Sequence, residues 1–279
     1  MAPGADRAAG TLRTMSSVLE GILAAHRRSA EADDRPLDAL IRAAGSTAPA
    51  RPFRAELAGP GFSVIAEVKR RSPSAGTLAA DLRPASLARA YEAGGAAALS
   101  VLTDAEFFGG TPADLASARA ACALPALRKD FTVSEADVCD ARLMGADAVL
   151  LIVAALSDDE LARFRALAVD LGMGALVEVH TEAELDRALA AGADLIGVNR
   201  RDLRTFEVDR DLAERLIVRM PPGVVTVAES GVRHADDAAD LAACGYNAVL
   251  VGETLVRSAD PAEVIRSFRG ADRGPGRLE

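Results

Sequence analysis

Two opposite charges close the first long apolar stretch of the sequence, SVIAEVK (63–69). In a strand, residues two apart share a face, so Ile65, Glu67 and Lys69 would point the same way. A buried charge without a partner is costly, so these two groups must pair with each other or bind a charged ligand. The stretch therefore predicts either an internal ion pair or a site for a charged substrate.

Polar residues also close most of the later apolar runs. At or just after their ends stand Lys129, Glu178, Asn199, Glu229, Ser230, Gly231, Gly252 and Glu253. If the runs are parallel strands of a closed barrel, inward-facing residues near the carboxyl ends converge, which is where this fold carries its catalytic groups. Two carboxylates, two lysines and an amide would then line one pocket. The alternative, a solvated cluster of salt bridges, explains one such residue more easily than the whole set.

The elements that would position these residues are short strands alternating with helices. Eight apolar runs recur, and several follow a glycine, as in GGAAALSVL (94–102) and MGADAVLLIV (144–153). Such runs are typical of parallel strands that are covered on both faces. Amphipathic segments separate them, and SEAD and TEAE supply N-caps at Ser134 and Thr181. The alternation predicts an α/β protein with a (β/α)8 TIM barrel. A doubly wound open sheet is the alternative, but no G-x-G-x-x-G follows the first run.

The barrel is expected over residues 59–270, with an N-terminal helical extension over 15–58. The extension holds two helical patterns, MSSVLEGILAAHRRSAEAD and RPLDALIRAAG, which are expected either to cap one barrel end or to form a lid beside the substrate. Residues 1–14 are expected to be a disordered tail and 271–279 a loose one. Translation is expected to start at either Met1 or Met15.

Composition excludes several classes of function. The 41 acidic residues outnumber the 32 basic ones, and no basic cluster is interleaved with aromatics, so no nucleic-acid partner is expected. No apolar run approaches the roughly 20 residues of a membrane span. Cys122, Cys139 and Cys244 show neither metal-ligand nor disulfide spacing, which favours small buried thiols in a reducing cytoplasm.

No metal site is predicted, because His26, His180 and His234 are far apart in the sequence. His180 follows a strand end, where a supporting or surface role is expected. A phosphate site is predicted instead. AESGV and VGETL place glycines before probable helix starts after the last two strands, and backbone N–H groups at such turns cradle phosphate.

The motifs around these residues resemble those of one known family. EVKRRSPSAG, LTDAEFFGG, LRKDF, GADAVLLIV, ALVEVH, GVNRRDL, VAESGV and VLVGE stand in the order found in indole-3-glycerol-phosphate synthases, over about residues 60 to 258. The resemblance implies a carboxy-lyase of tryptophan biosynthesis that needs no cofactor or metal. Such an enzyme converts 1-(2-carboxyphenylamino)-1-deoxyribulose 5-phosphate to indole-3-glycerol phosphate, carbon dioxide and water.

The resemblance implies roles position by position. The catalytic residues it implies are Glu67, Lys69, Lys129, Glu178, Asn199 and Ser230. The substrate-binding residues are Ser72, Phe108, Phe131, Leu150, Arg201 and Leu203, of which Phe108, Phe131, Leu150 and Leu203 would flank the anthranilate ring. The phosphate-binding residues are Lys69, Gly231, Gly252 and Glu253.

Lys129 is the expected acid at the ketone oxygen, with a pKa lowered by burial and by nearby Lys69. Lys69 would pair with the substrate carboxylate until carbon dioxide leaves, or also donate a proton. Glu178 would carry one proton transfer of the dehydration, while Glu67 and Asn199 position the hydroxyl and the lysines. The division of roles between the two lysines stays open.

Three positions depart from the family pattern. Ala75 stands where many relatives have lysine, in the loop RRSPSAG (70–76), which is expected to be mobile and to close over the substrate. Arg200 replaces a small or amide residue, and its side chain is expected to point away from Asn199 with little effect. No aromatic residue precedes Phe53, which removes the expected N-terminal contact to the anthranilate ring.

Two other functions are alternatives to the synthase reaction. A same-fold phosphosugar isomerase, such as phosphoribosylanthranilate isomerase, would use a cysteine base and an aspartate acid, but no cysteine stands at these strand ends. A catalytically silent paralogue that binds a phosphorylated ligand would have no need for the whole set of charged residues. The expected partner is a small phosphorylated substrate, with no nucleic acid and no membrane, and a monomer is one compatible state of assembly.

Overall fold

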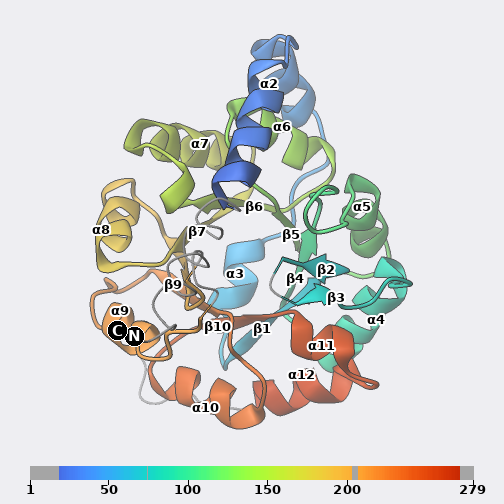
Figure 1. Cartoon of the computed structure of the whole chain (residues 1–279), viewed down its shortest axis with the longest axis vertical. Coiled ribbons are helices and arrows are strands. Elements are labelled where there is room, and N and C mark those ends of the chain that lie inside the picture. Colours follow the sequence, from blue (N-terminus) through green and yellow to red (C-terminus); the bar gives the residue numbers. More distant parts are fainter. Residues whose placement is uncertain (1–18, 74, 203–206, 271–279) are drawn as a thin grey trace, which may run out of the picture.

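The structure, a computed structural model, describes residues 19–73, 75–202 and 207–270. Its centre is a closed barrel of eight parallel strands (Figure 1). The strands are β1 (Ser63–Val68), β4 (Ala98–Leu102), β5 (Ala126–Lys129), β6 (Ala148–Ile152), β7 (Gly174–Val179), β8 (Leu195–Asn199), β9 (Val225–Glu229) and β10 (Ala248–Val251). Neighbours in sequence pair in space, and β1 closes the ring by pairing with both β4 and β10. The predicted (β/α)8 barrel is confirmed.

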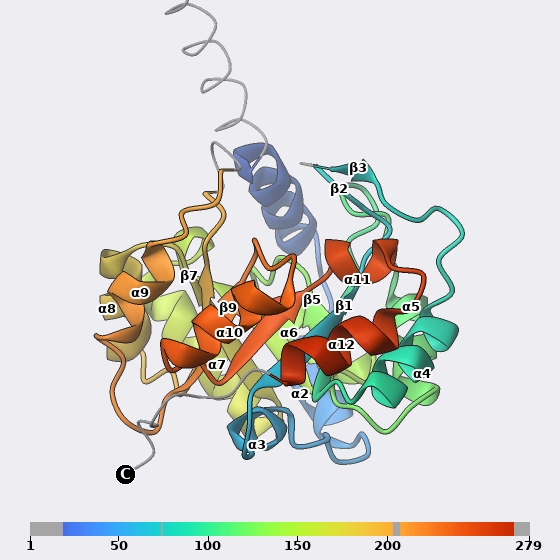
Figure 2. The same cartoon turned by 90° about the horizontal axis from the view of Figure 1, so that it is seen from below.

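Helices surround the barrel on its outer side, as Figures 1 and 2 show. Those after the strands are α4 (Pro84–Gly94), α5 (Pro112–Ala120), α6 (Glu135–Leu143), α7 (Asp158–Asp170), α8 (Glu182–Ala190), α9 (Leu212–Ile217), α10 (Ala235–Ala243), α11 (Glu253–Arg257) and α12 (Pro261–Arg269), with a 3-10 turn, η1 (Val153–Ala155), before α7. Before the barrel come a helix over residues 19–31, α2 (Leu37–Gly45) and α3 (Phe53–Ala58). Across the described ranges, no helix has the length and apolarity that a membrane crossing requires.

Hydroxyl side chains fix where several helices begin. Ser134 and Thr181, the two predicted N-caps, accept hydrogen bonds from the backbone N–H of Asp137 and Glu184, respectively. Ser157 does the same for α7 and completes a capping box with Glu160. These bonds satisfy N–H groups that have no partner within the helix.

The alternation of side chains along β1 divides the apolar residues into two layers. Val64, Ala66 and Val68 join the core between the strands and the outer helices. Ile65 points into the barrel, where it packs with inward residues of the other strands. Glu67 lies on the same inner face and is buried. The parity predicted from the sequence is therefore confirmed.

Helices of the N-terminal segment lie at both ends of the barrel. Phe53 and Leu57 of α3 are buried in the inner apolar cluster, so α3 closes the end away from the strand carboxyl termini (Figures 1 and 2). The helix over residues 19–31 lies at the opposite end, where Leu19 and Ile22 line the cavity described below. The two expected roles, an end cap and an element beside the site, thus belong to different helices. The sequence did not predict α3, whose pattern FRAELA is shorter than two turns.

The loop after β1 contains a small hairpin. Arg71–Ser72 (β2) pairs antiparallel with Gly76–Thr77 (β3). The N–H of Ala75 donates to the hydroxyl of Ser72 at 3.2 Å. The hairpin brings Ser72 to the cavity edge, beside the C-terminal end of β1.

Candidate active site

A cavity of about 650 Å³ opens at the carboxyl ends of the barrel strands. It gathers side chains from the ends of all eight strands or from the loops that follow them. Among its lining are Glu67, Lys69, Ser72, Phe108, Lys129, Phe131, Leu150, Glu178, Asn199, Arg201, Ser230, Gly231, Gly252 and Glu253. Every predicted site residue in the described part of the chain is therefore brought to one place. Leu203 lies outside the described residues.

Lys129 lies between two buried carboxylates. Its Nζ is 2.8 Å from Oε2 of Glu178 and 2.6 Å from Oε2 of Glu229. The expected fall in its pKa is wrong. Burial does act to lower the pKa of Lys129, but the negative charges of Glu178 and Glu229 outweigh burial and raise the pKa above its ordinary value. Lys129 is therefore positively charged at neutral pH.

Lys69 and Glu67 form the second ion pair of the cavity, with Nζ 2.5 Å from Oε1. The hydroxyl of Ser100 donates to the other oxygen of Glu67 at 3.3 Å. Gly252 leaves room for this carboxylate, because a Cβ there would collide with Oε1. The two charges that end the first strand thus pair with each other at the barrel mouth.

The chain contains only two lysines, Lys69 and Lys129, and both line this cavity. Arginine supplies every other basic side chain. Arginine carries charge equally well but does not give up its proton in proteins, whereas lysine does. Lysine is thus present only where an ammonium group can both bind an anion and move a proton.

Glu229 is the functional residue to which the sequence analysis gave no role. It is buried, it contacts Lys129, and its pKa is raised to about 7, chiefly by burial and further by the nearby charge of Glu178. The alternation of side chains along the strand could have indicated its position in the sequence, since Val225, Val227 and Glu229 share one face of β9. Gly197, in the neighbouring strand β8, makes room for it, since a Cβ there would meet Oε1 of Glu229.

Glu178 begins a hydrogen-bonded chain that ends at the strained turn after β9. Asn199 donates from Nδ2 to Oε1 of Glu178 at 3.2 Å, and the Ser230 hydroxyl donates to Oδ1 of Asn199 at 2.8 Å. The N–H of Arg201 donates to the same Oδ1 at 3.1 Å, which fixes the amide orientation. Burial acts to raise the pKa of Glu178, but the charges of Lys129 and His180 hold it well below its ordinary value.

His180 supports Glu178 from behind. Its Nε2 is 3.3 Å from Oε1 of Glu178 in ion-pair contact, without the geometry of a hydrogen bond, and its Nδ1 is 3.2 Å from Oε2 of Glu184. Burial acts to lower the pKa of His180, but Glu178 and Glu184 raise it to about 9. His180 is therefore an imidazolium beneath the carboxylate, a supporting position like the one expected from the sequence.

The turn after β9 is held in an uncommon conformation. Ser230 and Gly231 have φ of 67° and 76°, and such left-handed values are rare for a residue other than glycine. Arg200 is buried and donates to the Ser230 carbonyl from Nε at 3.2 Å and from its terminal nitrogen at 2.6 Å. The side chain that was expected to have little effect therefore anchors this turn.

Apolar and aromatic side chains line the remaining wall of the cavity. The rings of Phe108 and Phe131 are tilted at 41° with centroids 6.3 Å apart, and Leu150 lines the same cavity. Leu19 and Ile22 reach it from the N-terminal helix. Aliphatic residues thus line the N-terminal side of the cavity, where the sequence offered no aromatic.

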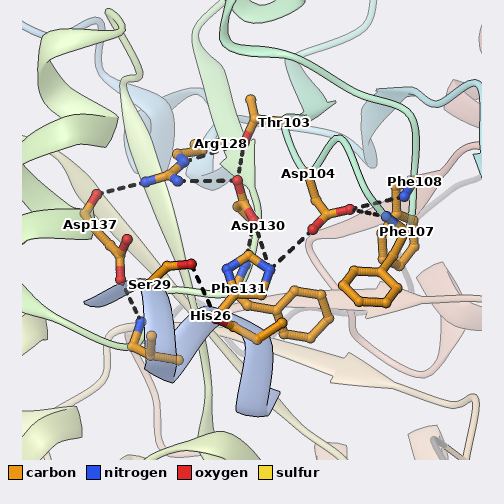
Figure 3. A network of polar contacts seen from close by, with 12 residues as sticks. His26, Ser29, Thr103, Asp104, Phe107, Phe108, Arg128, Asp130, Phe131 and Asp137 are labelled. Carbon is orange, nitrogen blue, oxygen red and sulfur yellow. Dashed lines mark hydrogen bonds and ion pairs between the residues drawn. The ribbon is translucent and has the colours of Figure 1, made fainter. Parts of the chain in front are cut away.

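One group of side chains in the described ranges has the spacing of a cation site. His26, Asp104 and Asp130 place a ligand atom each within 4.8 Å of the others. No sequence motif indicates this group, because His26 is 78 positions from Asp104. Figure 3 shows it beside Phe108 and Phe131, at the rim of the cavity.

Comparison with known proteins points to one family. The family model described as indole-3-glycerol phosphate synthase matches residues 19–268. The chain is 54% identical over 261 residues to indole-3-glycerol phosphate synthase 2 of Streptomyces coelicolor, covering 92% of this chain and 100% of that protein. It is 49% identical over 262 residues to the indole-3-glycerol phosphate synthase of Mycobacteroides abscessus, covering 93% and 96% of the two chains.

Among solved structures, a thiamine phosphate pyrophosphorylase from Pyrococcus furiosus superposes with a TM-score of 0.58. The match covers 78% of this chain and 96% of the other, at 15% sequence identity. At that identity the likeness concerns the fold alone.

Proposed function

Because this chain belongs to the indole-3-glycerol phosphate synthase family, we propose that the paired charges of its cavity carry out the family's ring closure, with Lys129 as the acid. The chain is a carboxy-lyase of tryptophan biosynthesis that acts on a phosphorylated small molecule. The residue roles below follow from matching that chemistry to the contacts in the cavity.

Ring closure needs a proton donor at the ketone oxygen. The aromatic carbon that bears the carboxylate attacks the ketone carbon, and the electrons of the C=O bond move to oxygen, which takes up a proton. Lys129 is suited to give that proton, because it is charged at neutral pH and its Nζ is fixed between Glu178 and Glu229. A positioned acid of this kind contributes about 10²–10⁴ in rate.

Loss of carbon dioxide then restores the aromatic ring. The electrons of the bond to the carboxylate return to the ring carbon, so the carboxylate must be held until that moment. Lys69 is suited to hold it, because its ammonium group is turned into the cavity beside Glu67 and is partly exposed there. Lys69 also remains available to the phosphate, whose other contacts would be backbone N–H groups at Gly231, Gly252 and Glu253.

Dehydration removes the new hydroxyl together with a proton from the forming pyrrole ring. Glu178 is suited to accept that proton, since its lowered pKa keeps it ionised at neutral pH, and Lys129, once reprotonated from solvent after ring closure, can donate to the departing hydroxyl. Asn199 and Ser230 then orient Glu178 through their hydrogen bonds. The departing water contains the hydroxyl and one proton from Lys129, and the proton removed from carbon remains on Glu178.

The observation that carries the proposal is the placement of both lysines of the chain in this one cavity. The test compares Lys129→Arg with Lys129→Ala, using the carboxyphenylamino deoxyribulose phosphate and the fluorescence of the indole product. Both variants should lose about 10²–10⁴ in kcat, because neither can donate the proton. Lys129→Arg keeps the positive charge and should keep measurable substrate binding. Normal turnover by Lys129→Arg would show that charge alone suffices and would refute the acid role.

We also infer that the working unit is a monomer in a reducing compartment such as the cytoplasm. A single copy of the chain brings together all the proposed site residues in its described ranges. The three cysteines are free thiols, as expected where disulfides do not persist. Sedimentation at assay concentration tests the first point: a dimer that loses activity on dilution would contradict it.

A further inference from the structure

We propose that His26 is a positioning residue of this active site, which ties the loops after β4 and β5 to the N-terminal helix and thereby fixes the rings of Phe108 and Phe131. The inference rests on the proposed function, because that function assigns the two rings to the substrate's aromatic ring. His26 lies outside the barrel, on the helix over residues 19–31, and is not part of the cavity lining. Its effect on the reaction would therefore pass through other residues.

His26 contacts three groups from two different loops, as Figure 3 shows. Its Nε2 is 3.1 Å from Oδ2 of Asp104, which follows β4, and 4.0 Å from Oδ1 of Asp130, which follows β5. Its ring also packs on Phe131, with centroids 5.3 Å apart and planes tilted by 39°. One imidazole thus joins the helix to both loops.

The partner of His26 shapes the turn that carries Phe108. Oδ1 of Asp104 accepts hydrogen bonds from the N–H groups of Phe107 at 2.6 Å and of Phe108 at 3.0 Å, while Oδ2 faces His26. Releasing Oδ2 would free the Asp104 side chain to rotate, and the two N–H groups would lose their acceptor. The position of the Phe108 ring therefore depends on His26 through one shared carboxylate.

Asp130 holds the second ring in a comparable way. Its Oδ1 accepts from the N–H of Phe131 at 2.9 Å, and its Oδ2 accepts from the hydroxyl of Thr103 and from Arg128. Both carboxylates of the cluster are thus occupied by donors from the chain. Because their oxygens already accept hydrogen bonds from groups in the two loops, the geometry fits a link between the N-terminal helix and these loops better than a cation site.

The charges around His26 favour its protonated form. The groups that face it are Asp104, Asp130 and Asp137, which come from the two loops and from α6, and Arg128 is already paired with Asp130. The hydrogen bond to Asp104 raises the pKa of His26 above 6.5, although burial acts in the opposite direction. The contacts of protonated His26 with Asp104 and Asp130 therefore contribute their full stabilisation below pH 6.5. This contribution is lost as the pH rises through the raised pKa of His26.

The test uses His26→Gln, which removes the charge, and His26→Lys, which keeps a charge at every pH of the assay. The matched control is Arg27→Ala on the same helix, because Arg27 holds Glu160 and the carbonyls of Val133 and Ala155 but nothing in the turn after β4 that carries Phe108. Hydrogen exchange is measured on the peptide covering residues 104–109. Exchange there should quicken in His26→Gln and stay at the wild-type rate in Arg27→Ala. Unchanged exchange in His26→Gln overturns the inference whatever the activity.

Kinetics then separate a positioning role from a purely structural one. In His26→Gln, KM should rise about three- to tenfold with kcat within about twofold, as for the replacement of a charged hydrogen-bond donor by a neutral one. In the wild type, KM should rise above the pKa of His26, and this rise should be absent in His26→Lys. An unchanged KM in His26→Gln overturns this inference and leaves the proposed function standing. Absence of turnover in the wild type overturns the proposed function and this inference with it.

Discussion

At the scale of residues, the site is a set of three buried carboxylates around two ammonium groups. Glu67 pairs with Lys69, while Glu178 and Glu229 share Lys129. The shared pair is unequal, because the pKa of Glu178 is held low and that of Glu229 is raised to about 7. Glu229 is thus the carboxylate of this pair that is protonated first as the pH falls.

This inequality predicts opposite effects of two similar substitutions on stability. Burying ionised Glu229 costs folding free energy that grows from about pH 4.5 to pH 7, since the folded-state pKa lies above the unfolded one. Glu229→Gln should therefore be more stable than the wild type at pH 8 by about 1–3 kcal/mol, with the difference shrinking toward pH 5. Its turnover should fall, because Lys129 loses a partner.

The matched variant is Glu178→Gln. Because the pKa of Glu178 is lowered, its ionised form stabilises the fold above its unfolded pKa, and that stability is lost as the pH falls through the folded value. This variant should be less stable than the wild type at pH 8. Urea unfolding at pH 5 and pH 8 measures both, and a loss of stability in both variants at pH 8 would contradict the assignment of unequal carboxylates.

At the scale of elements, glycines in the strands decide where the carboxylates fit. Gly197 in β8 lies beside Glu229 of the neighbouring strand β9, and Gly252 after β10 lies beside Glu67 of the neighbouring strand β1. Neither position has the positive φ that would itself call for glycine. The space beside the carboxylate is the reason for glycine at both.

Gly197→Ala should displace the carboxylate of Glu229 and with it the ammonium of Lys129. A shift of about 1 Å in a catalytic group typically costs about 10²-fold in rate, and that loss is expected in kcat. The control is Gly174→Ala in β7, where a Cβ would make only ordinary contacts with Ala148 and Phe53. Steady-state assays and thermal melts of both variants decide the point, and equal activities would mean that the strand relaxes to accept the methyl group.

At the scale of the whole molecule, stability and chemistry lie at opposite ends of the barrel. Phe53 and Leu57 close one end with apolar side chains, and the charged residues occupy the other (Figure 2). The apolar layer between them includes Ile65, Leu127 and Val227. Changes at the closed end should therefore alter folding far more than catalysis.

Phe53→Ala should cost about 3–5 kcal/mol of unfolding free energy, because the side chain is fully buried in the inner cluster. Its kcat at a temperature where it remains folded should match the wild type. Val218→Ala is the control, since Val218 is 68% exposed and its loss should change stability by less than about 0.5 kcal/mol. Chemical denaturation with parallel assays tests both, and a large fall in kcat for folded Phe53→Ala would show coupling between the two ends.

Local patterns were enough to predict the barrel and most of its site. The period of two along SVIAEVK placed Glu67 inside, and strand ends located Lys129, Glu178 and Asn199. These inferences need only the direction of a side chain and the rule that strand carboxyl ends share one rim.

Features that depend on distant partners were missed. The contacts of His26 join residues whose separation in sequence gives no hint of contact, and α3 owes its helix to packing inside the barrel rather than to its six residues. The shift in the pKa of Lys129 was predicted in the wrong direction. Burial, which lowers this pKa, was visible in the sequence pattern, but Glu229, the second carboxylate that raises it, had been given no role. Electrostatics at a site depends on every charge present, so one omission reverses the result.

Closure of the ring between β1 and β10 has a consequence for how the enzyme is made. Ser63–Val68 leaves the ribosome early, whereas its second neighbour, Ala248–Val251, is translated near the end of the chain. Until then the first strand keeps an open edge, and Glu67 lacks the backbone wall that Gly252 provides. The wall around Glu67 is therefore complete only after the last strand has been translated, when synthesis is almost finished.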